Sequence, residues 1–136
     1  MGRTYTLSKK EILFNDNKRI IIEEKSDDYQ YAEVTYSNGK DTIYIGSYFT
    51  AYSIDKEWIE FNGEYVVIME YIRGDRYVGP RVVRMFDMKN EQFVEGNVDE
   101  LLEIYAQSFG KYLVVTTEDQ STGSELIKKY KPIKLD

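Results

Sequence analysis

Short apolar segments bounded by turn residues recur along the chain, and this pattern is typical of β-strands. The clearest example spans residues 57–88, where two apolar segments flank Asn62-Gly63. Because Asn and Gly tolerate the positive φ of a two-residue hairpin turn, we predict a hairpin in which Ile59 faces Val66. The second limb, residues 65–72, is then apolar on both faces. We therefore place it centrally, either in a sheet beneath a helix or in a closed barrel.

Similar apolar segments and turn residues predict further strands on either side of this hairpin. Residues 3–7 form either a short first strand or an unpaired arm. Gly46, inside one of the limbs, indicates a bulge or a close approach of another segment. The other predicted strands are residues 11–14 and 18–25, residues 29–36 and 41–49, and residues 81–88, 92–95 and 111–117. Turns rich in asparagine separate the early hairpins, which predicts an antiparallel meander.

The apolar period changes to 3.6 after Asn97, which predicts an amphipathic helix over residues 98–109. Asn97 and Glu100 have the spacing of a capping box, and Gly110 is suited to end the helix. A short C-terminal helix is predicted over residues 125–130. The fold class that follows is α+β, in one domain spanning residues 1–136. It is a strongly curved antiparallel meander or small β-barrel with one packed amphipathic helix and a short C-terminal helix.

The composition restricts the chemistry more than it specifies it. The chain of 136 residues contains no cysteine and no histidine. Thiolate catalysis, disulfides, iron–sulfur clusters and the usual zinc ligands are thereby excluded, together with the commonest general base. We expect a protein without enzymatic activity, cofactor or metal site. No long apolar segment is present, so we also expect a soluble, cytoplasmic protein that does not bind membranes.

The formal net charge of −6 disfavours direct binding to nucleic acids. Against this background, arginines and tyrosines gather around one predicted loop. Guanidinium groups suit phosphates and carboxylates, so the cluster suggests an anion site, a protein interface, or internal pairing with acids such as Glu70. Strand alternation places Arg81 and Arg84 on opposite faces. The cluster consists of Arg73, Arg76, Arg81, Arg84, Tyr71 and Tyr77.

Glutamates on the central hairpin are a second candidate site. Glu57 and Glu64 are predicted to share one face, and two such carboxylates are the catalytic groups of many glycosidases. Acids at strand ends are also ordinary solvent-facing residues.

Two functional hypotheses follow. The first is a non-enzymatic acidic interaction protein that binds a basic protein or nucleoprotein, such as a bacterial or phage inhibitor or immunity protein with an anti-defence role. Its interface would use the acids Glu23, Glu24, Asp27, Asp28, Asp99, Glu100 and Glu103. The alternative is a ligand-binding β-barrel for a phosphorylated or otherwise anionic, nucleotide-like small molecule held by the arginine and tyrosine cluster.

Overall fold

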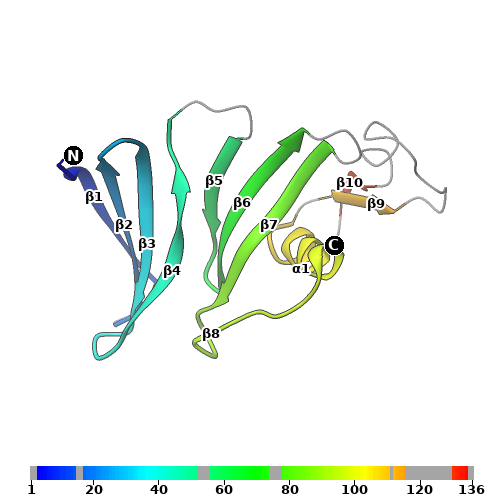
Figure 1. The fold of residues 1–136 in the computed structure, drawn as a ribbon. Coiled ribbons are helices and arrows are strands. Elements are labelled where there is room, and N and C mark those ends of the chain that lie inside the picture. Colours follow the sequence, from blue (N-terminus) through cyan, green and yellow to red (C-terminus); the bar gives the residue numbers. More distant parts are fainter. Residues whose placement is uncertain are drawn as a thin grey trace.

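Ten strands and one helix form the described part of the chain, which comprises residues 3–14, 17–51, 56–73, 78–110, 112–115 and 130–134 of a computed structural model (Figure 1). The elements are β1 (Tyr5–Leu13), β2 (Arg19–Ser26), β3 (Gln30–Ser37), β4 (Thr42–Phe49), β5 (Lys56–Phe61), β6 (Tyr65–Arg73), β7 (Val78–Asp87), β8 (Gln92–Phe93), α1 (Val98–Ser108), β9 (Tyr112–Val115) and β10 (Tyr130–Lys134).

The strands make two four-stranded antiparallel sheets, ordered β1-β2-β3-β4 and β5-β6-β7-β8, and a separate pair of β9 and β10. The predicted antiparallel, strand-rich α+β class is confirmed. The closed barrel is wrong, because β4 and β5 belong to different sheets and do not pair. The chain instead buries its apolar faces by placing one sheet against the other, as Figure 1 shows.

The main core lies between the two sheets. Because successive side chains of a strand alternate between faces, every second residue of β2, β3 and β6 points toward this core, and β7 contributes Phe86. Its buried members are Ile20, Ile22, Ala32, Val34, Tyr36, Ile45, Val66, Ile68, Phe86 and Met88.

A second core lies between the other face of the β5-β8 sheet and α1. It consists of Val67, Met69, Val82, Met85, Leu102 and Tyr105. The molecule therefore has three layers, in the order sheet, sheet, helix (Figure 1). Strand β6 lies between β5 and β7 and is covered on both faces, which confirms its predicted central position.

The register of the β5–β6 hairpin differs from the prediction. Ile59 faces Ile68 rather than Val66. The side-chain oxygen of Asn62 accepts hydrogen bonds from the backbone amides of Glu64 and Tyr65, at 2.8 and 2.7 Å, so the turn is centred one residue later than expected. Because the pairing shifts by two residues, every side chain keeps its predicted face.

Helix α1 begins as its sequence predicts. The Asn97 side chain accepts from the Glu100 amide at 2.9 Å, and the Glu100 carboxylate accepts from the Asn97 amide at 3.1 Å. Gly110 follows the helix with a φ of +65°, a conformation that glycine adopts without a steric penalty. The buried face consists of Leu102, Tyr105 and Ala106.

Both ends of the chain differ in part from expectation. Strand β1 is one continuous element with a bulge near Leu7, so the predicted first strand is paired from Tyr5 onward and is not an unpaired arm. Strand β9 confirms the predicted strand after the helix, but it pairs with β10 and not with either large sheet. Of the predicted C-terminal helix, residues 125–129 lie outside the described residues, and Tyr130 begins β10.

Candidate functional site

The arginine cluster does not converge in the described part of the chain. Arg81 lies opposite Glu70 on paired strands, and its Nη2 atom is 2.7 Å from Glu70 Oε2. This pair confirms, for Arg81, the internal charge pairing that the sequence offered as one interpretation. Both side chains are partly exposed, so the pair contributes little to stability.

Arg84 is also engaged by the chain itself. Its guanidinium lies 5.0 Å from the ring centroid of Phe93 and donates to the carbonyl of Ile45 at 3.4 Å. The expected opposite facing of Arg81 and Arg84 is wrong, because a bulge in β7 inserts Val83 between their paired positions. Both arginines lie on the face that looks toward the β1-β4 sheet.

Among the remaining members of the cluster, the structure describes only the side chain of Tyr71. Tyr71 lies on the opposite face of β6, on the side of α1, and has interactions of its own. Arg76 and Tyr77 lie outside the described residues, as does the side chain of Arg73.

The glutamates of the central hairpin do not form the predicted pair. Glu57 faces Glu70 across the strands, whereas Glu64 lies in the turn at the other end of the hairpin. Glu57 accepts a hydrogen bond from the Phe49 amide at 3.0 Å, which ties β5 to the end of β4. Glu57 therefore holds a group of the chain itself.

Glu60 lies under the helix. It accepts hydrogen bonds from Trp58 Nε1 at 3.0 Å and from the hydroxyl of Tyr105. Burial, together with the bond to this carboxylate, raises the pKa of Tyr105 far above its usual value. This arrangement joins β5 to α1 and serves the fold.

The acids around the β2–β3 turn fall on different surfaces. Glu23 lies on the outer face of the first sheet, where Lys25 pairs with it at 3.2 Å and also pairs with Glu33. The hydrogen bonds from Lys25 to these two carboxylates raise the pKa of Lys25, and the bond to Glu33 has the larger effect. Glu24 faces the other sheet and is half buried near Tyr48. Only Asp27 and Asp28 remain as exposed acids of the turn itself.

These two aspartates line a surface hollow of about 560 Å³ together with exposed aromatic rings. Tyr29 is 65% exposed and Phe49 is 46% exposed, and their ring centroids are 5.8 Å apart. We call Asp27, Asp28, Tyr29 and Phe49 the acidic aromatic hollow. Among the described residues that line it, none is a lysine or arginine. Its lining is completed by Ser26, Gln30 and Ala51.

The hollow is built by the backbone around it. Asp27 Oδ1 accepts from the Tyr29 amide at 2.9 Å, and the Asp27 amide donates to the Tyr29 carbonyl at 2.9 Å, which fixes the turn. The Thr50 amide donates to the Gln30 carbonyl at 3.1 Å, so the end of β4 lies beside the start of β3. Phe49 is thereby brought next to Tyr29.

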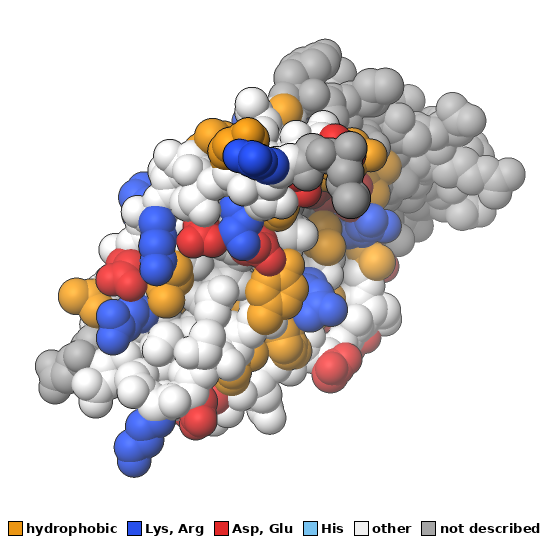
Figure 2. Space-filling view, turned by 60° about the vertical axis from the view of Figure 1, so that its left-hand side comes forward, with side chains coloured by type: hydrophobic (Ala, Val, Ile, Leu, Met, Phe, Trp, Pro, Cys, Tyr) orange, Lys and Arg blue, Asp and Glu red, His pale blue; other side chains and the backbone are white. Residues whose placement is uncertain are grey.

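The other predicted interface acids lie on the helix, in the third layer of the molecule (Figure 1). Asp99 and Glu103 are exposed on α1, and Glu100 is used in the capping box. The seven predicted interface residues therefore do not form one surface. Acidic and basic side chains are interspersed over the side of the molecule seen in Figure 2, so the net charge alone does not define a binding face.

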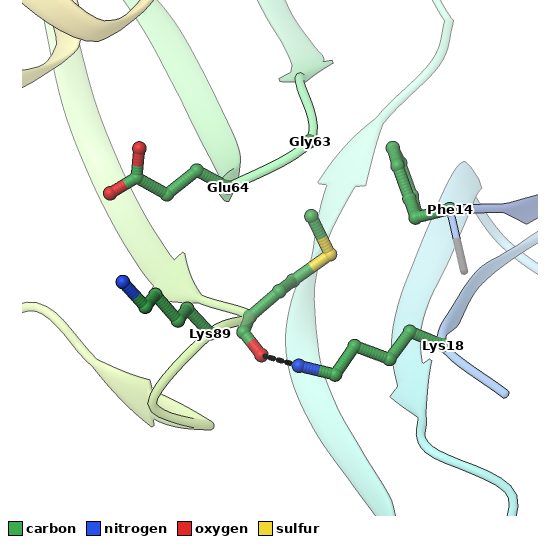
Figure 3. Close-up of a pocket in the computed structure, with 6 residues that line it drawn as sticks. Phe14, Lys18, Gly63, Glu64 and Lys89 are labelled. Atoms are coloured by element: carbon green, nitrogen blue, oxygen red, sulfur yellow. Dashed lines mark hydrogen bonds between the residues drawn. The ribbon is translucent and has the colours of Figure 1, made fainter. Parts of the chain in front are cut away.

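A second cavity, of about 320 Å³, lies between the two sheets at the opposite end of the molecule. Figure 3 shows Phe14 and Lys18 on one wall and Gly63, Glu64 and Lys89 on the other. The ammonium of Lys18 donates to the Met88 carbonyl at 3.0 Å. Both signs of charge meet here, since Glu64 lines the same cavity as the two lysines. The mixed charges of this cavity therefore do not select an anionic or a cationic ligand.

The described residues contain no candidate metal site and no membrane-spanning helix, and no similar protein was found. Within the described ranges, no three acidic side chains are placed to hold a metal ion, and no helix has the length and apolar character needed to cross a bilayer. Comparison with known proteins found no matching family model, no similar curated protein and no similar solved structure.

The charge pattern of the sequence pointed to Asp27 and Asp28, but the two aromatic residues were missed. Tyr29 directly follows Asp28, but the sequence does not show that its side chain is exposed and therefore accessible to a partner. Phe49 is twenty residues away, and pairing of β3 with β4 brings it close. The predicted hairpin of residues 29–36 and 41–49 contained the signal for this proximity.

Proposed function

We propose that this protein is a non-enzymatic interaction protein that binds a basic surface of a protein or nucleoprotein target through the acidic aromatic hollow. The observation that carries the proposal is the hollow itself, in which two exposed aspartates adjoin two exposed aromatic rings. Aromatic side chains are enriched in the energetically dominant parts of interfaces. Carboxylates beside them give charge complementarity to lysine and arginine.

The hollow is preferred over the helix acids for a physical reason. Asp99 and Glu103 are exposed, but no large exposed aromatic side chain of the described chain accompanies them. Exposed charges without desolvated neighbours contribute little binding free energy. The helix surface therefore serves as the comparison surface in the experiment below.

The anion-binding alternative has less support. Arg81 is paired with Glu70, and Arg84 lies over Phe93. Binding a phosphate would require these arginines to exchange partners that they already hold. The bacterial or phage origin, the inhibitor or immunity role and the cytoplasmic location stay predictions from the sequence.

The test is a capture experiment from bacterial lysate with three immobilised forms of the chain. The double variant Asp27→Asn/Asp28→Asn neutralises the hollow while keeping the shape of its side chains. The variant Asp99→Asn/Glu103→Gln makes the same change of charge on the helix. We expect wild type and the helix variant to retain the same basic protein, identified by mass spectrometry, and the hollow variant to lose it.

Salt provides the second arm of this experiment. Raising the ionic strength from about 0.05 M to 0.3 M should release most of the bound protein, because exposed charges are screened within a Debye length. Equal capture by the hollow variant, or capture that is indifferent to salt, would contradict the proposal.

A further inference from the structure

The acidic aromatic hollow has features that favour one of the two basic side chains, lysine or arginine, on a partner. The choice between them rests on the proposed function and concerns which residue of the partner enters the hollow. It follows from the exposed aromatic rings and from the free carboxylate.

The backbone that carries the two aromatic rings is held before any ligand arrives. The backbone of Tyr29 is fixed by Asp27 Oδ1, and the backbone amide of Phe49 donates to Glu57 Oε1 at 3.0 Å. The two rings contact each other with an interplanar angle of 53°, so they form a corner and not a parallel pair of plates. Because the Tyr29 side chain is exposed, part of its ring is accessible to a planar group from solvent. Since this backbone is already ordered and an aromatic side chain has only two χ angles, little conformational entropy is lost on binding.

The two aspartates have different tasks. Asp27 commits one carboxylate oxygen to the turn. Asp28 is exposed and makes no ion pair with any lysine or arginine of the described chain. The nearby ammonium of Lys25 is held by Glu23 and Glu33 on the outer face of the sheet. Asp28 is therefore the carboxylate that is available for a ligand.

A guanidinium fits these groups better than an ammonium. It is planar, it is weakly hydrated, and it stacks on an aromatic ring while its edge donates two parallel hydrogen bonds to one carboxylate. An ammonium is a compact, strongly hydrated charge that gains less from an exposed ring. The hollow, at about 560 Å³, accommodates a whole arginine side chain.

We propose that the acidic aromatic hollow receives an arginine side chain of the partner, with its guanidinium stacked on Tyr29 and its edge bonded to Asp28. The apolar part of that side chain lies against Phe49. The arginine is then the anchor of the interface, and the remaining contacts of the basic surface surround it.

The test uses the full chain, labelled with ¹⁵N, and capped five-residue peptides of glycine with one central arginine, lysine or citrulline. Citrulline keeps the shape of arginine and removes its charge. We expect the arginine peptide to bind in the millimolar range and to shift the amides of Asp28, Tyr29 and Phe49. The lysine peptide should bind at least about threefold more weakly, because it stacks poorly. The citrulline peptide should produce no saturable shift.

Variants locate the site. Asp28→Asn and Tyr29→Leu should each weaken the arginine peptide by about fivefold or more. Asp41→Asn, an exposed acid at the other end of the first sheet, is the matched control and should leave the affinity unchanged. A preserved ¹⁵N spectrum shows that each variant is folded.

Equal affinity for arginine and lysine peptides, or shifts that map elsewhere, would overturn the arginine assignment. Its failure is distinguishable from that of the proposed function. If these peptides fail while the captured partner is still lost from Asp27→Asn/Asp28→Asn, the hollow remains the binding surface and only the anchor is wrong. If that variant keeps the partner, the proposed function is wrong as well.

Discussion

Glu91 is a non-glycine residue with a φ of +54°, in the turn between β7 and β8. Its carboxylate oxygen Oε2 accepts from the Tyr36 hydroxyl at 2.9 Å and from the Asn38 side chain at 2.6 Å. Burial and the bond to Glu91 raise the pKa of Tyr36 to about 12. These bonds join a turn of the second sheet to the end of the first, and they stabilise an otherwise unfavourable backbone conformation.

The variant Glu91→Gly tests this balance. Glycine removes a backbone penalty of about 1–2 kcal/mol, but its larger unfolded-state entropy offsets roughly 0.5–1 kcal/mol of that gain. The Tyr36 hydroxyl, whose residue is 0% exposed, is left without its acceptor, at a cost of about 1–3 kcal/mol. We expect net destabilisation by about 1 kcal/mol in urea unfolding. Glu91→Gln keeps an acceptor and should change stability less. A Glu91→Gly variant more stable than wild type would contradict this account, because the relieved backbone penalty would then outweigh the lost hydrogen bonds.

Asp87 connects stability to pH. Burial alone would raise the pKa of Asp87, but hydrogen bonds from the Asn90 side chain and from the amides of Asn90 and Lys89 lower it below its ordinary value. The Asn90 side chain donates to Asp87 Oδ2 at 2.6 Å, and the Lys89 amide donates to Oδ1 at 2.9 Å. The hydrogen bonds therefore favour the ionised carboxylate in the folded state.

A lowered folded-state pKa gives stability that is fully present above the unfolded-state pKa and is lost as the pH falls through the folded-state value. We expect the free energy of unfolding to decline as the pH drops below about 4, near the ordinary pKa of an aspartate. Urea titrations from pH 7 to pH 3 measure this decline. Asp87→Asn should flatten it, and an unchanged pH profile in that variant would contradict the assignment.

At the scale of the elements, the bulges carry information that alternation cannot supply. The sequence predicted a bulge or a close approach at Gly46, and both occur: the β3–β4 register shifts there, and a Cβ on Gly46 would lie 2.9 Å from Ile68 Cδ1. The bulge at Val83 in β7 has no glycine to indicate it in the sequence. For this reason the facing of Arg81 and Arg84 was predicted wrongly.

Alanine substitutions at Gly46 and Gly63 test whether the close approach at Gly46 constrains the fold. Gly46→Ala would crowd Ile68, which is 1% exposed in the main core, and we expect destabilisation by about 1–3 kcal/mol. Gly63→Ala meets nothing within 4 Å and should change stability by about 0.5 kcal/mol or less. Thermal unfolding of both variants measures the difference. Equal effects would show that the close approach at Gly46 is not a constraint.

Local rules predicted most elements because they act over a few residues. The capping box of Asn97 and Glu100, the continuous apolar segment of β6 and the Asn-containing turns are all visible in short windows of sequence. The predicted register of the β5–β6 hairpin is wrong by two residues, because the Asn62 side chain accepts hydrogen bonds from the backbone amides of the turn. A side-chain hydrogen bond of this kind cannot be recognised from the pattern of apolar residues.

At the scale of the whole molecule, the sequence pattern is compatible with both a closed barrel and two packed sheets. Barrel and sandwich both satisfy alternating strands with one apolar face, so periodicity cannot separate them. Pairing between β4 and β5 would have been needed for one continuous sheet, and it does not form. At the candidate site, Asp27 and Asp28 could be found from charge, whereas Phe49 joins them through the pairing of β3 with β4, which charge alone does not indicate.

The most direct test of the central claim is the affinity of the purified captured partner for two variants of equal charge. By titration calorimetry at low salt, Asp27→Asn/Asp28→Asn should weaken binding by about tenfold or more, and Asp99→Asn/Glu103→Gln by less than about twofold. Equal losses from the two surfaces would mean that net charge, and not the acidic aromatic hollow, governs recognition.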